Sequence, residues 1–338
     1  MEFRRGEATV MDLDQVTDDG AVVDVSVIIP AYNEANFIAA TVASVTRFIP
    51  RDFRREIIVV DHGSADDTVE LARSAGADVI EFPDAPTIAA LRNRGIARSS
   101  GRILVFLDAD TTLTEDWSRT VPQVIRNLDA DPLQLTGAKR SVPDSTSPMA
   151  RFWFAPKASD PRPTHLGGGH IITTRTLCDT INGFPEGMET GEDFRFCLNA
   201  KRAGAVINAV PSLRAVHNGL PSTLSQFFKR ETWHGRGDWT SLQTAFSTKV
   251  AVLTLIFIAL HLALLGSLFL LPELSSVTAV LIMAIVGMCV LASLIKYRKS
   301  NWAHVLCNTF MYYVYFAARA VAFFTVMAGS RVRKHQRS

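Results

Sequence analysis

Two aspartates, Asp108 and Asp110, stand one residue apart directly after the apolar run 103–107. Five consecutive apolar residues, rich in β-branched and aromatic types, are typical of a strand buried on both faces of a parallel sheet. Open α/β sheets bind ligands at the carboxyl edge of their strands, where these carboxylates would lie. Paired carboxylate oxygens at that edge would hold a divalent cation beside bound phosphates. The alternative is an ordinary polar turn, in which aspartate is common.

A second acidic pair, Glu192 and Asp193, follows Gly191 and begins a helix with apolar periodicity. Carboxylates in the first turn suit the positive end of a helix, so one interpretation of this pair is purely structural. Three glycines at 167–169 enter another predicted strand, and a backbone without side chains can approach a ligand closely there.

The elements that must position these residues alternate between strand and helix. Strands are predicted at 22–29, 57–60, 77–82, 103–107, 205–210 and 213–217. The first of them is expected to stop at Pro30, and a helix at 87–99 leads into the central strand. Alternation at this interval implies right-handed βαβ crossovers and a parallel sheet. Residues 113–163 are expected to be less regular and to lie on the acceptor side.

Composition excludes several classes of function. The chain has 338 residues, 48% of them hydrophobic, and its net charge of +2 is not gathered on a basic face, so no nucleic-acid partner is expected. Its four cysteines lie far apart without CxxC spacing, which argues against a zinc site or a disulfide framework. The first residues lack the apolar segment of a signal peptide, so the N-terminal domain is expected in the cytoplasm. No GxGxxG motif follows the first strand, which weakens the case for a nicotinamide-dependent oxidoreductase.

Five motifs occur in order between residues 22 and 240. They are Val25-Ser26-Val27-Ile28-Ile29-Pro30-Ala31-Tyr32-Asn33-Glu34, Val59-Val60-Asp61-His62-Gly63-Ser64, Arg92-Asn93-Arg94-Gly95, Asp108-Ala109-Asp110 and Gly191-Glu192-Asp193. With these motifs the chain resembles the family 2 inverting glycosyltransferases. The resemblance implies an α/β fold of the GT-A type, with a Rossmann-like, mostly parallel sheet. It also implies a nucleotide-diphosphate sugar donor and a divalent metal, Mg²⁺ or Mn²⁺.

The resemblance assigns the donor's nucleoside to the first two motifs. Pro30, Tyr32 and Glu34 match the family's loop around the nucleoside, and the tyrosine would stack on the base or pack beneath it. Asp61 matches the acidic residue that ends the second strand. The family often has a second acid next, in contact with a pyrimidine base, whereas this chain has His62. The base of the donor is therefore left open.

The resemblance assigns the metal and the diphosphate to the motif of Asp108 and Asp110. Asp110 matches the direct metal ligand, and Asp108 lies near the ribose or the metal. The metal would neutralise the diphosphate and stabilise it as the leaving group. Arg94 would help to hold the phosphates, or it is an exposed helix charge. His217 is a further metal ligand or diphosphate contact, or a structural histidine.

Asp193 matches the family's catalytic base. An inverting transfer needs one carboxylate to remove the acceptor's proton while that oxygen attacks the anomeric carbon opposite the leaving diphosphate. Glu192 is the neighbour expected to hold the geometry of the base.

Processive members of the family carry Gln-x-x-Arg-Trp after the base, and this chain departs from that pattern. Gln226 is followed by Arg230, but the tryptophan is displaced to Trp233. The departure favours transfer of a single sugar. Arg230, Trp233 and Arg236 are phosphate or acceptor contacts, or a basic, aromatic collar at a membrane surface.

Residues 249–328, about a quarter of the chain, are predicted to be a membrane domain. It lies between the catalytic domain, predicted at 22–240, and a basic tail at 329–338. Residues 1–21 are predicted to be a flexible tail. The stretches 250–271 and 277–295 carry no formal charge and are long enough to cross a hydrocarbon core of about 30 Å. The turn between them carries Glu273, while both outer flanks are basic. The positive-inside rule then places the catalytic domain in the cytoplasm of a multi-pass protein of the cell membrane.

The third apolar stretch, 302–328, is predicted to lie in the cytoplasmic interface or to re-enter it. If it spanned, the basic tail would end outside, against the positive-inside rule. On a helix, one face collects His304, Asn308, Tyr312, Tyr315 and Arg319. We expect this polar stripe to face headgroups or the active site. The alternative is a third span whose stripe packs on the other two helices.

These features predict a membrane-anchored inverting glycosyltransferase that moves one sugar onto a lipid or lipid-linked acceptor. A polyprenyl-phosphate glycosyl synthase is the alternative within the same class, and its phosphate acceptor needs little base catalysis. An alternative of another class is an inactive nucleotide-binding module that regulates or scaffolds an envelope-assembly complex.

Overall fold

The computed structural model describes residues 22–143, 146–154, 161–239, 245–246, 248–270, 275–297 and 302–329. The predicted tail at 1–21 lies outside the described residues. So do Glu273 and the basic residues from 330 onward, together with the flank at 298–301.

A seven-stranded, mostly parallel sheet forms the centre of the α/β part of the chain, the predicted catalytic domain, in the order β3-β2-β1-β4-β7-β6-β8. Its strands are β1 (Val25–Ala31), β2 (Arg55–Asp61), β3 (Asp78–Glu81), β4 (Ile103–Leu107), β6 (Gln134–Gly137), β7 (His170–Thr174) and β8 (Val206–Ala209). β1 to β4 are mutually parallel, whereas β7 pairs antiparallel with both β4 and β6. β5 (Thr111–Leu113) and β9 (Ala215–His217) form a separate antiparallel pair. The predicted α/β class and the burial of residues 103–107 on both faces are confirmed.

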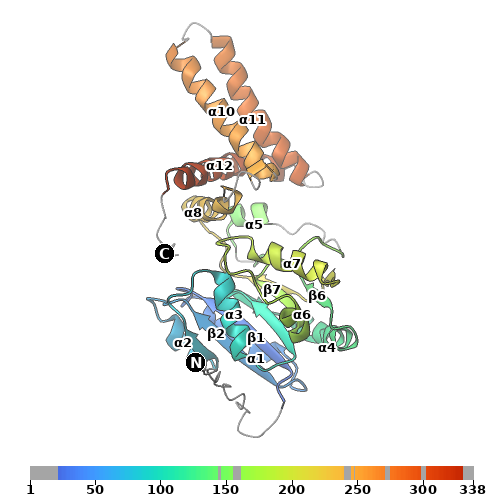
Figure 1. The fold of residues 1–338 in the computed structure, drawn as a ribbon. Coiled ribbons are helices and arrows are strands. Elements are labelled where there is room, and N and C mark those ends of the chain that lie inside the picture. The colour runs from blue at the N-terminus through green and yellow to red at the C-terminus, as the bar shows by residue number, and fades with distance from the viewer. Residues whose placement is uncertain are drawn as a thin grey trace, which may run out of the picture.

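Helices cover both faces of the sheet (Figure 1). They are α1 (Ile38–Phe48), α2 (Thr68–Ser74), α3 (Ile88–Arg98), α4 (Glu115–Ala130), α5 (Pro148–Phe154), α6 (Arg175–Thr180), α7 (Glu192–Arg202), α8 (Leu224–Gly235) and the short 3₁₀ helix η1 (Arg236–Trp239). The largest apolar cluster joins β1, β2 and β4 to α1 and α4, and a second cluster packs α7 on the opposite face.

Two local predictions were wrong. β1 does not stop at Pro30 but continues to Ala31. The proline is tolerated because β4 pairs with β1 only as far as Ile28, so no ladder hydrogen bond is lost on that side. Within the region expected to be irregular, α4 is a helix of 16 residues that contains Pro122. Thr114 caps it, and the buried Trp117, with apolar residues at helical spacing beyond it, outweighs the hydrogen bond that the proline removes.

Three long apolar helices follow the catalytic domain: α10 (Lys249–Leu270), α11 (Ser275–Tyr297) and α12 (Trp302–Met327). Each is long and apolar enough to cross a membrane. α10 and α11 project side by side away from the catalytic domain, whereas α12 lies across their base, over α8 and α5 (Figure 1). The three helices therefore do not form one parallel bundle.

The predicted polar stripe of α12 exists, and it faces the catalytic domain. His304 Nε2 and Asn308 Nδ2 lie 3.1 and 3.2 Å from the carbonyl oxygen of Phe152, in α5. Tyr312 and Tyr315 pack their rings against Trp153. The stripe thus holds α12 to α5 rather than serving only as a contact to α10 and α11.

Arg319, at the far end of this stripe, enters a buried charge cluster on α8 and η1. Its Nη2 lies 3.0 Å from Glu231 Oε2, and its Nη1 lies 3.0 Å from Asp238 Oδ2. At Gly235 the two helices come so close that a Cβ would stand 2.8 Å from the Cβ of Ala322. The two ion pairs of Arg319 and the close helix crossing at Gly235 together fix α12 on the catalytic domain.

Candidate active site

The two aspartates after β4 lie at the carboxyl edge of the sheet, as predicted, and they share one guanidinium. Arg140 Nη1 is 2.7 Å from Asp108 Oδ2 and 3.8 Å from Asp110 Oδ1. The same nitrogen donates to Thr111 Oγ1 at 3.0 Å. Arg140 follows β6 in an extended stretch that is fixed to β9, since Ser141 N donates to Ala215 O at 2.8 Å.

A second guanidinium connects the Asp108 carboxylate to the acidic pair of α7. Arg92, on α3, is only 2% exposed and reaches Glu192 Oε1 at 2.7 Å and Asp108 Oδ1 at 3.3 Å. Its guanidinium also lies over the ring of Phe184, 5.2 Å from the centroid. Residues from three distant motifs are therefore joined by one buried side chain.

Asp193 is brought to the same site by the glycines at 167–169. Gly168 N donates to Asp193 Oδ2 at 3.0 Å, and Phe194 N donates to Asp193 Oδ1 at 2.7 Å. At Gly169 a Cβ would stand 2.2 Å from Asp108 Oδ2. At Gly168 a Cβ would stand 2.8 Å from Arg92 Nη2, so two of the three glycines are required by close approach to charged side chains.

On the other side of the aspartate pair, Asp110 is almost fully buried. Its Oδ2 lies 3.1 Å from His217 Nε2, and its carbonyl oxygen accepts from Asn218 N at 2.8 Å. At Gly219 a Cβ would stand 2.0 Å from Asp110 Oδ2, so this wall must also be glycine. The structure thus brings together Asp108, Asp110 and His217, the three residues predicted around a metal.

The charges around the pair set its protonation. Burial alone would raise the pKa of Asp108, but the guanidinium groups of Arg140 and Arg92 outweigh it and hold the pKa below its ordinary value. Burial lowers the pKa of His217, and Arg140 acts in the same direction against the raising effect of Asp110. At neutral pH the site therefore holds an ionised carboxylate beside a neutral imidazole.

The residues predicted around the nucleoside cluster at the ends of β1 and β2. Asp61 is buried and accepts from both the backbone and the hydroxyl group of Ser64. The Ser64 hydroxyl in turn accepts from Asn33 N at 2.8 Å, and Glu34 N donates to Thr68 Oγ1 at 2.8 Å. These bonds tie the loop after β1 to the loop after β2.

The rings beside this loop are Tyr32 and His62, whose centroids are 5.5 Å apart. Pro30 lies within β1, opposite Val60. Arg94 is not joined to the aspartate pair. It is exposed, and its guanidinium lies 6.0 Å from the ring centroid of Phe82.

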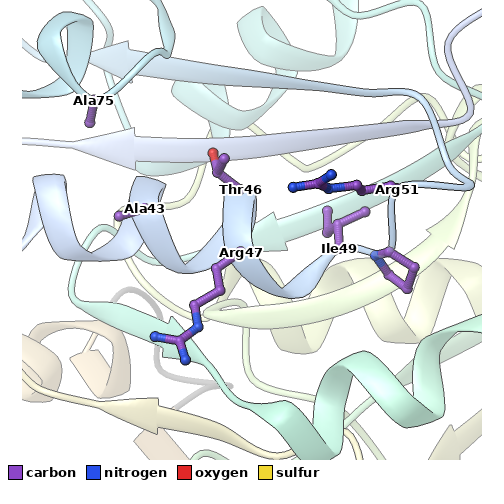
Figure 2. Close-up of a pocket in the computed structure, with 7 residues that line it drawn as sticks. Ala43, Thr46, Arg47, Ile49, Arg51 and Ala75 are labelled. Carbon is purple, nitrogen blue, oxygen red and sulfur yellow. The ribbon is translucent and has the colours of Figure 1, made fainter.

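Among the hollows on the described surface, two differ in their relation to the aspartates. One, of about 590 Å³, is lined by the end of α1 together with Ala75 (Figure 2). Helices of a parallel α/β sheet run opposite to its strands, so the end of α1 lies at the edge away from the aspartates. The other, of about 410 Å³, is lined by Phe37, Ser147 and Asn218 among others, and Asn218 bonds to Asp110. The second hollow adjoins the charge cluster.

The residues present fit a divalent cation that is shared with a phosphate. Two carboxylates and a neutral imidazole are suitable ligands, and the side chain of Asp108 is 28% exposed and so accessible to a ligand. Within the described part of the chain, no group of three or more acidic, histidine or cysteine side chains is arranged to hold a metal without help. Mg²⁺ in particular is held in many enzymes by one or two carboxylates and completed by substrate phosphates.

Residues 26–176 match the model of "Glycosyl transferase family 2". The chain carries a family 2 glycosyltransferase domain. It is 28% identical over 245 residues to the glycosyltransferase AglE of Haloferax volcanii, covering 68% of this chain and 80% of AglE. It is also 28% identical over 229 residues to the pre-mycofactocin glycosyltransferase of Mycobacterium tuberculosis, covering 63% of this chain and 46% of that relative. The chain is accordingly a glycosyltransferase.

The fold of this glycosyltransferase is also found among solved structures. A mannosyltransferase of Pyrobaculum calidifontis, solved in complex with GDP-Man and Mn²⁺, superposes with a TM-score of 0.57. Its sequence is 17% identical, and the match covers 92% of this chain and 89% of the other. The likeness confirms the predicted GT-A type of fold with C-terminal helices.

Sequence reasoning named the motif around Arg92 but assigned its chemistry to Arg94. Helix geometry explains the difference: residues two apart on a helix point to different sides, so only one of the two arginines can face the site. Arg140 was not predicted at all. Its only signal in the sequence is a basic residue shortly after β6, and spacing does not relate it to the aspartates.

Proposed function

We propose that this glycosyltransferase inverts the anomeric centre as it moves a single sugar from a nucleotide-diphosphate sugar to a lipid or lipid-linked acceptor at the cytoplasmic face of the membrane. The observation that carries the proposal is the single cluster in which Asp193 and Asp108 flank the run of glycines at 167–169. An inverting transfer requires a base and a site for the leaving group, and the closeness of Asp193 to Asp108 supports assigning these two roles to them.

In this proposal Asp193 accepts the proton of the acceptor hydroxyl as its oxygen attacks the anomeric carbon. Its Oδ2 is oriented by Gly168 N–H, so the carboxylate has a fixed direction. Glu192 does not reach the acceptor. It binds Arg92, which also contacts Asp108 and so fixes the position of α7 relative to Asp108. The exposed ring of Phe194, with His165 5.5 Å away, forms a wall beside the base for the acceptor.

Asp108, Asp110 and His217 would hold the metal, which when bound would neutralise the diphosphate as it leaves. Pro30, Tyr32, Glu34 and Asp61 would surround the nucleoside. Arg94, whose guanidinium lies over the ring of Phe82, would contact only the edge of the donor.

The membrane arrangement supports the acceptor class. α10 begins at Lys249 and α11 carries Lys296 near its end, so both ends of the hairpin next to the catalytic domain are basic. With this hairpin spanning, α12 would lie in the cytoplasmic interface, because it crosses the base of the hairpin (Figure 1). The domains would be the catalytic part at 22–240 and the membrane part at 249–328.

The surroundings of the basic and aromatic residues of α8 favour their role in a membrane collar over a role in acceptor binding. Arg230 pairs with Glu231 at 2.8 Å and lies over the ring of Phe154, 4.8 Å away, next to α12. Trp233 packs on His234.

The test is a donor screen on the full chain in nanodiscs with Mn²⁺ or Mg²⁺, with and without a membrane lipid extract. Nucleotide diphosphate release that needs the lipid identifies the donor and the acceptor class. Asp193→Asn should lower the rate about 10²- to 10⁴-fold. The control is Asp179→Asn, an exposed acid on α6, with unchanged activity expected.

Other outcomes separate the alternatives. Full activity of Asp193→Asn with a polyprenyl phosphate would favour the polyprenyl-phosphate synthase. Nucleotide binding without turnover under every condition would favour the regulatory module. To test the topology, Ser338→Cys in a Cys307→Ser background is probed in intact cells; labelling from outside would refute an interfacial α12.

A further inference from the structure

We infer that Arg140 is the resident counter-cation of the Asp108 and Asp110 pair: a divalent metal displaces its guanidinium, which then binds a phosphate oxygen of the substrate, so that metal and phosphate bind cooperatively. The inference rests on the proposed function, because it takes the aspartate pair as the metal site. It concerns a residue outside the predicted donor and metal set.

The position of the guanidinium is the first argument. One nitrogen, Nη1, lies within 2.7 Å of Asp108 and 3.8 Å of Asp110, in the place of a cation that both carboxylates share. At Gly169 a Cβ would stand 2.3 Å from this same nitrogen, so the backbone of Gly169 passes close beside it. A metal ion and the guanidinium cannot both occupy it, since two cations at this separation repel strongly.

The freedom of the side chain is the second argument. Arg140 is 21% exposed and Asp108 is 28% exposed, so their contact is partly open to solvent. Arg92, which also touches Asp108, is 2% exposed and enclosed. The backbone of Arg140 is held, because Ser141 N bonds to Ala215 O and His217 N bonds to Ser141 O. Displacement therefore moves the side chain of Arg140 and leaves the site intact.

The chemistry of the new partner is the third argument. A displaced guanidinium needs another anion near the site, and a phosphate bound to the metal supplies one, with two oxygens that the planar guanidinium can contact at once. The metal gains the two carboxylates only when Arg140 has left them. Each ligand thus removes an obstacle to the other, which is positive coupling between their binding free energies.

The experiment measures binding without turnover on the full chain in nanodiscs. Free Mn²⁺ is followed by electron paramagnetic resonance, and UDP and GDP are titrated in turn by calorimetry. Without nucleotide, Arg140→Met should bind Mn²⁺ about tenfold more tightly than the wild type, because the competing cation is gone. With Mn²⁺ present, the variant should bind the nucleoside diphosphate about tenfold more weakly, because a charge-assisted contact is lost.

The matched control is Arg119→Met, which removes the same charge from the exposed Glu115 pair of α4 and should change neither affinity. If Arg140→Met does not fold, Arg140→Gln carries the same expectations. Equal Mn²⁺ affinity in the wild type and the folded variant would overturn the inference. So would a wild type whose Mn²⁺ affinity is the same with and without nucleotide.

A further arm separates the two sources of phosphate. Nanodiscs that contain a polyprenyl phosphate replace the nucleotide in the same titration. Coupling with UDP or GDP assigns the contact to the donor, and coupling with the polyprenyl phosphate alone assigns it to the acceptor. Coupling with neither overturns the inference. Failure of every nucleoside diphosphate to bind would instead refute the proposed function, while the nucleotide-free Mn²⁺ comparison still tests Arg140 by itself.

Discussion

Arg92 and Arg319 form the same arrangement in two regions of the molecule. In each, the guanidinium of a largely enclosed arginine, 2% exposed for Arg92 and 11% for Arg319, connects two carboxylates from different elements. Arg92 joins Glu192 to Asp108, and Arg319 joins Glu231 to Asp238. In both, the Nε atom is buried without a hydrogen-bond partner among the described residues. The position of each guanidinium therefore depends on the placement of its two carboxylate partners.

The surroundings distinguish the two clusters. Around Arg92 the walls are glycines, and Asp108 is shared with the partly exposed Arg140. Around Arg319 the neighbours are the ring of Tyr315 and the crossing at Gly235. The first cluster leaves one carboxylate accessible to a ligand, whereas the second joins one part of the chain to another. Similar ionic chemistry can therefore serve either a reaction or an assembly, and the residues at its boundary decide which.

The largest effect is expected for Arg92→Met. It leaves Glu192 and Asp108 without their shared partner, which costs about 3–5 kcal/mol of folding free energy, and it lets α7 shift, lowering turnover at least about 100-fold. Unfolding in urea and nucleotide release measure the two effects. Arg98→Met on the same helix breaks the exposed pair with Asp78 and should cost less than about 1 kcal/mol. Equal losses of stability and turnover in the two variants would contradict the role assigned to Arg92.

Arg319→Met should destabilise the contact of α12 by about 3–5 kcal/mol, because the buried Glu231 and the partly buried Asp238 lose their partner. Metal and nucleotide affinities should be unchanged, in contrast to the Arg92 cluster. Limited proteolysis between the catalytic domain and α12 measures the release. Adding Glu231→Gln and Asp238→Asn to Arg319→Met should restore much of the loss, and a triple variant as unstable as the single one would show that charge is not the cause.

Acidification should weaken the catalytic domain before the α12 contact. His170 accepts from Trp117 Nε1 at 2.9 Å, and burial lowers its pKa from 6.5 to about 4. Between those values the unfolded chain binds a proton that the folded chain does not, so stability falls as the pH falls, by up to about 3 kcal/mol. Burial raises the pKa of Asp238, so proton uptake there favours the folded form instead.

The measurement for this comparison is urea unfolding at pH 7 and pH 4.5 in detergent. His170→Asn should show a smaller loss of stability between the two pH values than the wild type. An unchanged pH dependence would contradict the assignment to His170.

The smallest effect is expected for Gly235→Ala. The new Cβ would meet Ala322 Cβ at 2.8 Å, and such overpacking costs about 1–3 kcal/mol. Thermal unfolding in detergent measures it. Gly266→Ala on α10, where a Cβ would meet nothing within 4 Å, should cost nothing. A loss of stability of the same size in both variants would show that the close helix crossing is not its cause.

The sequence by itself determined the parts of this protein that are local or repeated. Hydrophobic runs and their spacing gave the parallel strands, the place of the aspartates at a strand end and the three long apolar helices. The polar stripe of α12 followed from helical periodicity alone. Five short motifs identified the family, because each motif is contiguous in the chain.

Only the tertiary structure decided which distant side chains share a charge. Arg92 rather than Arg94 faces the site because of the rotation of α3 against the sheet, and Arg140 reaches the aspartates because β6 and β9 bring its backbone beside them. The face that α12 presents to the catalytic domain was likewise set by packing on α5 and α8. Periodicity shows that a face exists, but contacts between segments far apart in sequence decide what it touches.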